Sequence, residues 1–423
     1  MMKSRLNIAW PVVAAALALA SCGLADPSPE WAGTIADSAG IRVVHNPEQG
    51  LWCPGEEWTF EDVLEIGAEG GDPAYEFGRI TSVQVGSDGS IFVFDPLASE
   101  IRVFDPEGVH VRSFGRRGQG PGEFGSAAAG IFLMDDGQLV VPDVGNGRIS
   151  RLSPAGEFLG SITASFAGGF PVRWDSDGDG SIVVQRRAMG MNEDPDLEAG
   201  DPLVRIAADG TEQMLVLMPK AETVWMEGAA PRFRYFATEP SWDLGPSGTL
   251  RTGMTQEYRI ALRGSDGAIH TILDKPSLPR EVTDADEFRF ETLLREALER
   301  TGISPDAVQR QIDRLSFGTT FPAFNQMMEG PDGTTLVQRI DALENIERLD
   351  LREEQSRRIG SSTWDVFGAD GRFLGPIELP ARFTPMVWRS DAVYGRWLDD
   401  QDVAHVRKLS LARGAGIPGE SCR

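Results

Sequence analysis

Charged side chains recur at one place in a repeated pattern of this sequence, a few residues after a turn glycine. They are Asp95, Asp143, Arg186 and Arg339, with Arg396 at a similar place in the last repeat. If the repeats pack side by side, the carboxylates and guanidinium groups meet near one point and can bind a polar ligand or an ion. The alternative is that the aspartates accept backbone hydrogen bonds and the arginines pair with nearby carboxylates.

Metal chemistry has little support in the sequence. The stretch DSDGDG, Asp175 to Gly180, resembles the opening of an EF-hand calcium loop, but Val183 and Arg186 stand where further ligands are needed, so a turn is favoured. The four histidines fall on expected outer strands or in the closing blade, so we do not expect three of them to converge on a zinc ion. No G-x-S-x-G or H-E-x-x-H motif is present. We therefore expect no metal, no cofactor and no catalytic residue.

The glycine-rich stretch FGRRGQGPGEFG, residues 114–125, offers another candidate site. It lacks the Gly-Lys-Ser/Thr of a phosphate-binding loop and the following helix of a dinucleotide-binding motif. Glycine and proline suit a sharp crossing between two sheets, and this is the favoured interpretation. The alternative keeps Arg116, Arg117 and Glu123 as ligand contacts.

Residues 218–242 are rich in aromatic and basic side chains, a composition typical of binding surfaces. The candidates for ligand contact in this segment are Trp225, Arg232, Arg234 and Tyr235. The segment can equally serve as a covering layer for a helical insertion, and both interpretations stay open.

The elements that must position these residues come from an internal repeat. A turn, an apolar strand, a polar loop, an Arg-containing strand, a second turn and a final strand occupy residues 86–115 and again 134–162. The first turn recurs at Asp88-Gly89, Asp136-Gly137, Asp179-Gly180, Ser247-Gly248, Asp332-Gly333 and Asp391-Ala392. A single four-stranded antiparallel unit cannot bury both of its faces, but six such units packed radially can. We therefore predict an all-β, six-bladed β-propeller.

Insertions interrupt this repeat at about 188–201, 220–241 and 279–320. The third reads as two helices within residues 283–315, with Thr283 and Ser304 as N-caps.

The segments FGRRGQGPGEF and DDGQLVVPDVGNGRISRLSPAGEFL resemble the consensus of NHL-repeat propellers. The resemblance is good over residues 80–162 and loose beyond them. It implies a fold rather than an activity, because such propellers include binding scaffolds and enzymes.

The ring is expected to close in its last blade with strands from both termini, which leaves no free sheet edge. Residues 41–46 and 57–67 are the N-terminal strands predicted to complete the sixth blade. This closure would bring Cys53 close to Cys422, and we expect a disulfide between them.

The N-terminus predicts the cellular location. Lys3 and Arg5 precede an apolar stretch from Ile8 to Ala20, as in a secretory signal. The run LASC that ends at Cys22 resembles the lipobox of bacterial lipoproteins. The expected organisation is a signal peptide at residues 1–21, a tether at 22–40 and the propeller at 41–423, held at the bacterial cell envelope, outside the cytoplasm, by acyl chains on Cys22.

Composition limits the partners. The chain has 423 residues, 64 Asp plus Glu against 40 Lys plus Arg and a net charge of −24, which argues against a nucleic-acid interface. The leading hypothesis is a tethered, non-enzymatic propeller that binds a protein or a small-molecule ligand on one face. The alternative is a lactonase-like hydrolase or lyase that uses carboxylates in the central channel of the propeller, with or without calcium.

Overall fold

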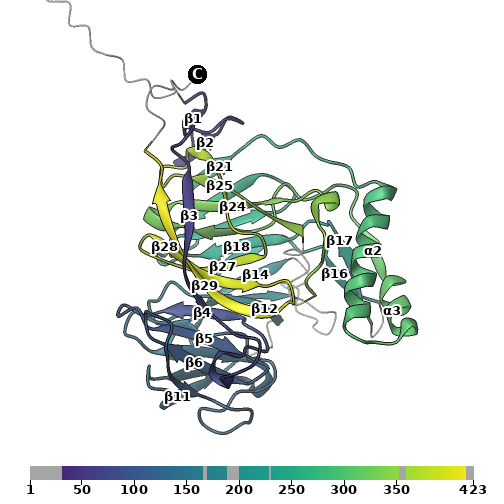
Figure 1. Cartoon of the computed structure of the whole chain (residues 1–423). Coiled ribbons are helices and arrows are strands. Elements are labelled where there is room, and N and C mark those ends of the chain that lie inside the picture. Colours follow the sequence, from purple (N-terminus) through teal and green to yellow (C-terminus); the bar gives the residue numbers. More distant parts are fainter. Residues whose placement is uncertain (1–30, 165–168, 188–199, 228–229, 352–358, 416–423) are drawn as a thin grey trace, which may run out of the picture.

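The computed structural model describes residues 31–164, 169–187, 200–227, 230–351 and 359–415. It is an all-β structure in which most strands form antiparallel sheets of four, and helices gather at one side (Figure 1). We number these sheets in chain order.

The strand bounds follow the chain. The first sheet contains β4 (Ser82–Val85), β5 (Ile91–Asp95), β6 (Glu100–Phe104) and β7 (His110–Phe114). The second contains β8 (Phe132–Leu133), β9 (Leu139–Asp143), β10 (Arg148–Leu152) and β11 (Phe158–Thr163). The third contains β12 (Phe170–Asp175), β13 (Ile182–Arg187), β14 (Asp201–Ile206) and β15 (Glu212–Met218).

The last three sheets are less regular. The fourth contains β18 (Pro240–Leu244), β19 (Leu250–Met254), β20 (Arg259–Arg263) and β21 (Ile269–Asp274), extended by β2 (Ile41–His45) and β1 (Thr34–Ser38). The fifth contains β23 (Met327–Glu329), β24 (Thr335–Ile340), β25 (Gly360–Phe367) and β26 (Phe373–Glu378). The sixth contains β27 (Phe383–Arg389), β28 (Ala392–Leu398), β29 (Ala404–Arg413) and β3 (Trp58–Ile66).

The predicted turn anchors fall between the first and second strands of all six sheets. Asp88-Gly89 joins β4 to β5, for example, and Gly89 adopts a φ of +85°, which glycine tolerates without strain. Asp88 then accepts a hydrogen bond from the Ser90 backbone amide at 3.0 Å. The four-strand repeat inferred from the sequence is therefore correct.

The sheets pack face to face through apolar side chains that alternate along each second strand. On β5, Ile91 and Val93 contact the sixth sheet, whereas Phe92 and Phe94 face the second. Similar buried clusters join the second sheet to the third, the third to the fourth, the fourth to the fifth and the fifth to the sixth. Both faces of these strands are buried, which explains their continuous apolar sequences.

One predicted N-terminal strand takes a different place. β3 pairs antiparallel with β29 at the outer edge of the sixth sheet, as expected (Figure 1). β2, expected in the same sheet, instead pairs in parallel with β21 of the fourth sheet. The prediction that residues 41–46 complete the sixth blade is therefore wrong, and of the two N-terminal strands only β3 lies in that sheet. The segment between β2 and β3 crosses the fifth sheet, where the Trp52 amide donates to the Leu374 carbonyl at 2.7 Å.

The insertions at about 220–241 and 279–320 gather beside the third to fifth sheets (Figure 1), whereas most of the insertion predicted at 188–201 lies outside the described residues. A small sheet is formed by β16 (Val224–Glu227), β17 (Ala230–Tyr235) and β22 (Leu315–Phe317). The helices α2 (Asp284–Arg300) and α3 (Pro305–Ile312) begin after Thr283 and Ser304, as predicted, and Thr283 forms a capping box with Asp286. Within the described ranges, no helix is both long and apolar enough to cross a bilayer.

Candidate functional site

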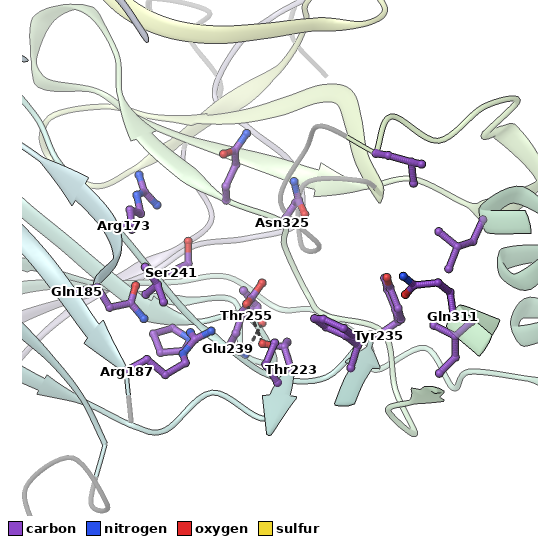
Figure 2. A pocket seen from close by; sticks show the side chains of 18 of the residues that line it. Arg173, Gln185, Arg187, Thr223, Tyr235, Glu239, Ser241, Thr255, Gln311 and Asn325 are labelled. Atoms are coloured by element: carbon purple, nitrogen blue, oxygen red, sulfur yellow. Dashed lines mark hydrogen bonds between the residues drawn. The ribbon is translucent and has the colours of Figure 1, made fainter. Parts of the chain in front are cut away.

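A cavity of about 530 Å³ lies between the sheets and the helical insertion. One side is formed by the ends of β12, β13 and β18, and the other by β17, β22, α2 and α3 (Figure 2). A cavity of this size suits a small molecule of ordinary metabolite size.

A hydrogen-bonded chain builds the polar wall of this cavity. The Trp242 indole Nε1 donates to Gln185 Oε1 at 2.8 Å, and Gln185 Nε2 donates to Asp201 Oδ2 at 2.8 Å. Arg187 Nε donates to the same Asp201 oxygen at 2.8 Å. Asp201 is completely buried, so its charge needs the Arg187 guanidinium as a partner. This chain holds Gln185 and Arg187 in fixed positions on the wall.

A second polar group lies across the floor. Thr223 Oγ1 donates to Glu239 Oε2 at 3.3 Å, and the Glu239 amide donates to Thr255 Oγ1 at 3.1 Å (Figure 2). Asn325 Nδ2 donates to Gln338 Oε1 at 2.7 Å. The Asn325 Oδ1 atom is buried and has no hydrogen-bond partner within the described residues. The floor therefore presents hydroxyl, carboxyl and amide groups that bind one another.

The opposite wall is apolar. It presents Leu294 and Leu298 from α2 together with Leu315 of β22. Tyr235 is held here by its ring contact with Phe290, with centroids 4.4 Å apart. The cavity therefore combines hydrogen-bonding groups on the sheets with an apolar surface on the insertion.

Carboxylates and arginines gather beside this cavity, near the ends of the first strands, and Arg173 of this group also lines the cavity. Arg173 lies 4.0 Å from both Asp175 and Asp243, and Arg251 lies 2.9 Å from Glu329. Burial and the neighbouring Asp243 charge raise the pKa of Asp175 to about 7. Burial also raises the pKa of Asp243. One of these carboxyl groups can thus hold a proton near neutral pH.

The calcium-like stretch forms the predicted turn between β12 and β13. The Arg205 guanidinium lies 3.2 Å from Asp177 and 3.0 Å from Asp179, so these carboxylates have an internal cation as partner. Across the described residues, no group of His, Cys, Asp and Glu side chains is arranged to hold a metal ion.

Comparison with known proteins identifies the architecture. Residues 73–166 match a domain family, DUF5128, described as a 6-bladed beta-propeller. A solved structure of a DUF4221 family member from Bacteroides vulgatus is 12% identical, covers 85% of this chain and 100% of its own, and superposes with a TM-score of 0.52. The chain is a β-propeller. Its four-stranded sheets are the blades.

More distant propellers have lower structural similarity. Virginiamycin B lyase from Staphylococcus aureus is 13% identical, with 84% of this chain and 100% of the lyase covered, at a TM-score of 0.42. A gluconolactonase from Xanthomonas campestris is 14% identical, with 83% and 99% covered, at a TM-score of 0.40. No curated protein matches this propeller significantly in sequence.

The two predicted aspartates bind backbone amides of the connectors that lead into their blades. Asp95 is buried and accepts from the amides of Gly78 and Leu97 at 2.8 and 3.0 Å. Asp143 is buried and accepts from the Gly125 amide at 2.9 Å. These contacts are the backbone-capping alternative raised from the sequence.

The predicted arginines also engage nearby acids. Arg186 forms two hydrogen bonds to Glu212, at 2.7 and 2.6 Å. Arg339 binds Asp365 through Nε and Nη2 at 2.9 and 2.6 Å. Arg396 lies 3.7 Å from Asp350. Ligand binding by any of these residues stays a prediction.

The glycine-rich stretch crosses from the first blade to the second, as predicted. The Gly118 amide donates to the Phe124 carbonyl at 3.1 Å, and Phe124 is fully buried. Arg116 forms an ion pair with Glu123 at 2.7 Å, while Arg117 is exposed.

Different residues of the aromatic segment at 218–242 agree with each interpretation, ligand contact or a covering layer for the helical insertion. Phe233, Tyr235 and Phe236 pack against the helical insertion, which is the covering role. Trp225 is 39% exposed, and the Arg234 guanidinium lies 5.0 Å from its ring centre. Arg232 forms an ion pair with Glu227. Of the residues predicted for ligand contact, Tyr235 is the one that lines the cavity.

Sequence reasoning missed most of the cavity wall, including Gln185, Arg187 and Asn325. One signal was available, because the predicted insertions at 220–241 and 279–320 both contribute to this cavity. Insertions that meet on one face of a repeat protein commonly form its binding site.

Proposed function

We propose that this chain is a non-enzymatic, six-bladed propeller that binds a small polar ligand in the cavity beneath its helical insertion. The observation that carries the proposal is the contrast between the two cavity walls. Gln185 and Arg187 offer polar groups fixed by hydrogen bonds, whereas Leu294 and Leu298 offer an apolar surface. A ligand with a hydrogen-bonding edge and one apolar face matches both walls.

A closed ring of six blades is part of this proposal. Support comes from the buried clusters between consecutive sheets, including the cluster that joins the sixth sheet to the first. The pairing of β3 with β29 also supports closure, because it completes the C-terminal sheet with an N-terminal strand.

The cellular setting is a further part of the proposal. We infer attachment to the outer side of a bacterial membrane through lipid on Cys22. The support is the sequence alone, since residues 1–30 lie outside the described part of the chain. A tethered binding protein would capture its ligand in the cell envelope.

The test is a metabolite screen by thermal shift, followed by calorimetry with each hit. Ser241→Phe should fill the cavity, because Ser241 is buried on its wall, and should abolish binding of a genuine ligand. Gln311→Ala should weaken binding, while Gln309→Ala on the same helix, outside the lining, serves as the control. Binding that survives Ser241→Phe would contradict the assignment of this cavity.

A hydrolase or lyase is the second candidate, and one observation favours it. Asp175 has a pKa raised to about 7, the property expected of a general acid. A panel of lactones tested with wild type and Asp175→Asn separates the two functions. Turnover that disappears in Asp175→Asn would replace the binding proposal with catalysis.

A further inference from the structure

A second concavity, of about 970 Å³, lies between the fourth and fifth blades. It is lined by the connector of residues 275–280 that follows β21 and by residues 320–323 that precede β23. None of its lining residues belongs to the cavity beneath the insertion.

The chemistry of this concavity centres on Asp365, which is 1% exposed. Lys275 Nζ donates to Asp365 Oδ2 at 2.7 Å, and Arg339 Nη2 donates to Oδ1 at 2.6 Å. The Tyr258 hydroxyl donates to Oδ2 at 2.5 Å. One carboxylate therefore faces two cations and cannot neutralise both.

The excess positive charge is partly buried. Lys275 is 10% exposed and its ammonium lies 3.9 Å from the ring centre of Phe373. Burial lowers the pKa of Lys275, while Asp365 and the more distant Glu48 oppose this change. Nearby Asp274 is already engaged by Arg259 at 3.0 Å. An uncompensated charge in such surroundings favours binding of an anion.

Arg280 supplies an independent cation on the same concavity. Its guanidinium stacks on Phe321, 3.6 Å from the ring centre, and forms no ion pair with an acidic side chain of the described ranges. The stacking orients the planar group without using its N–H donors, which leaves them available to a ligand.

We propose that the concavity between the fourth and fifth blades binds a small anion with at least two charged oxygens, through Arg280, Arg339 and Lys275. Guanidinium groups bind both carboxylate and phosphate oxygens in pairs, so phosphate and polycarboxylate share this chemistry. The lining carries the basic side chains of Arg259, Lys275, Arg280 and Arg339 against the acidic side chains of Glu257, Asp274 and Asp365, a small excess of positive charge in a protein with a net charge of −24.

The test uses calorimetry on the folded protein at low ionic strength, with inorganic phosphate and citrate as separate probes. Wild type should bind at least one probe saturably, and the preferred probe distinguishes phosphate from carboxylate recognition. Arg280→Gln and Arg339→Gln should each weaken binding by about tenfold or more, because each removes a charge-assisted contact. Arg310→Gln, an exposed arginine on α3, is the matched control and should bind as wild type does.

Two outcomes would overturn the proposal. One is the absence of saturable binding of both probes by wild type at millimolar concentration. The other is an unchanged affinity in Arg280→Gln, which decides the matter alone if Arg339→Gln fails to fold. Ser241→Phe should leave anion binding intact, so failure here is distinct from failure of the insertion cavity.

Discussion

Arg187 and Asp201 form a buried ion pair at 2.8 Å, although an insertion separates them in the sequence. Arg187 ends β13 and Asp201 begins β14, so the two strands bring them together at the cavity wall. The pair stabilises the third blade and also holds Arg187 in position on the cavity wall.

Removing one partner of this pair should destabilise the protein. Asp201→Ala leaves the Arg187 guanidinium, only 11% exposed, without its carboxylate, and we expect unfolding free energy to fall by about 3 kcal/mol. Urea denaturation measures the loss. The control is Glu227→Ala, which breaks the exposed Arg232 pair, with side chains 61% and 31% exposed, and should cost about 1 kcal/mol or less. Equal losses in both variants would contradict the role given to Asp201.

Stability should depend on pH through Asp175. Its pKa is raised from 3.8 to about 7 in the folded state, so the folded protein holds a proton that the unfolded chain has lost. This contribution is fully present below pH 3.8 and is lost as pH rises to about 7. Asp175→Asn should therefore flatten the decline of stability across that interval, as measured by denaturation at several pH values.

The control for this experiment is Asp209→Asn. Hydrogen bonds from Thr211 lower the pKa of Asp209, which places its titration below the interval. A wild type that gains stability steadily from pH 4 to about 7, with the same slope in Asp175→Asn, would contradict the assignment.

The predicted lipid anchor on Cys22 should hold the protein in the membrane fraction of the cell. Cys22→Ser should move the protein from the membrane fraction to the soluble fraction, because a propeller without acyl chains has no other predicted attachment. Labelled fatty acid should enter wild type and not the variant. Wild type that takes up no label would exclude the lipoprotein hypothesis.

The last prediction is the disulfide between Cys53 and Cys422, which stays untested because Cys422 lies outside the described residues. The neighbouring geometry is favourable: Arg413 pairs with Trp58, and Gly414 lies directly against Gly55 and Glu56. Closing so long a loop stabilises by about 5 kcal/mol at most. Peptide mapping without reduction should recover the linked pair, and two free thiols would disprove it.

The four-strand repeat could be predicted from the sequence alone. Turn glycines such as Gly89 require positive φ values, and strands buried on both faces, such as Ile91–Asp95, need continuous apolar residues. The helix N-caps at Thr283 and Ser304 could also be predicted, because each cap bonds a backbone amide only three positions later. Such local conformations require particular residue types and can therefore be predicted from the sequence.

Only the tertiary structure decided which residues share a site. Gln185, Asn325 and Leu294 come from two blades and an inserted helix, and no sequence spacing relates them. The place of β2 was predicted wrongly for a similar reason. The sequence placed it in the sixth sheet with β3, whereas it pairs with β21 of the fourth. The choice of a partner strand far away in the sequence, and the meeting of insertions over one cavity, depend on the folded arrangement of the whole chain.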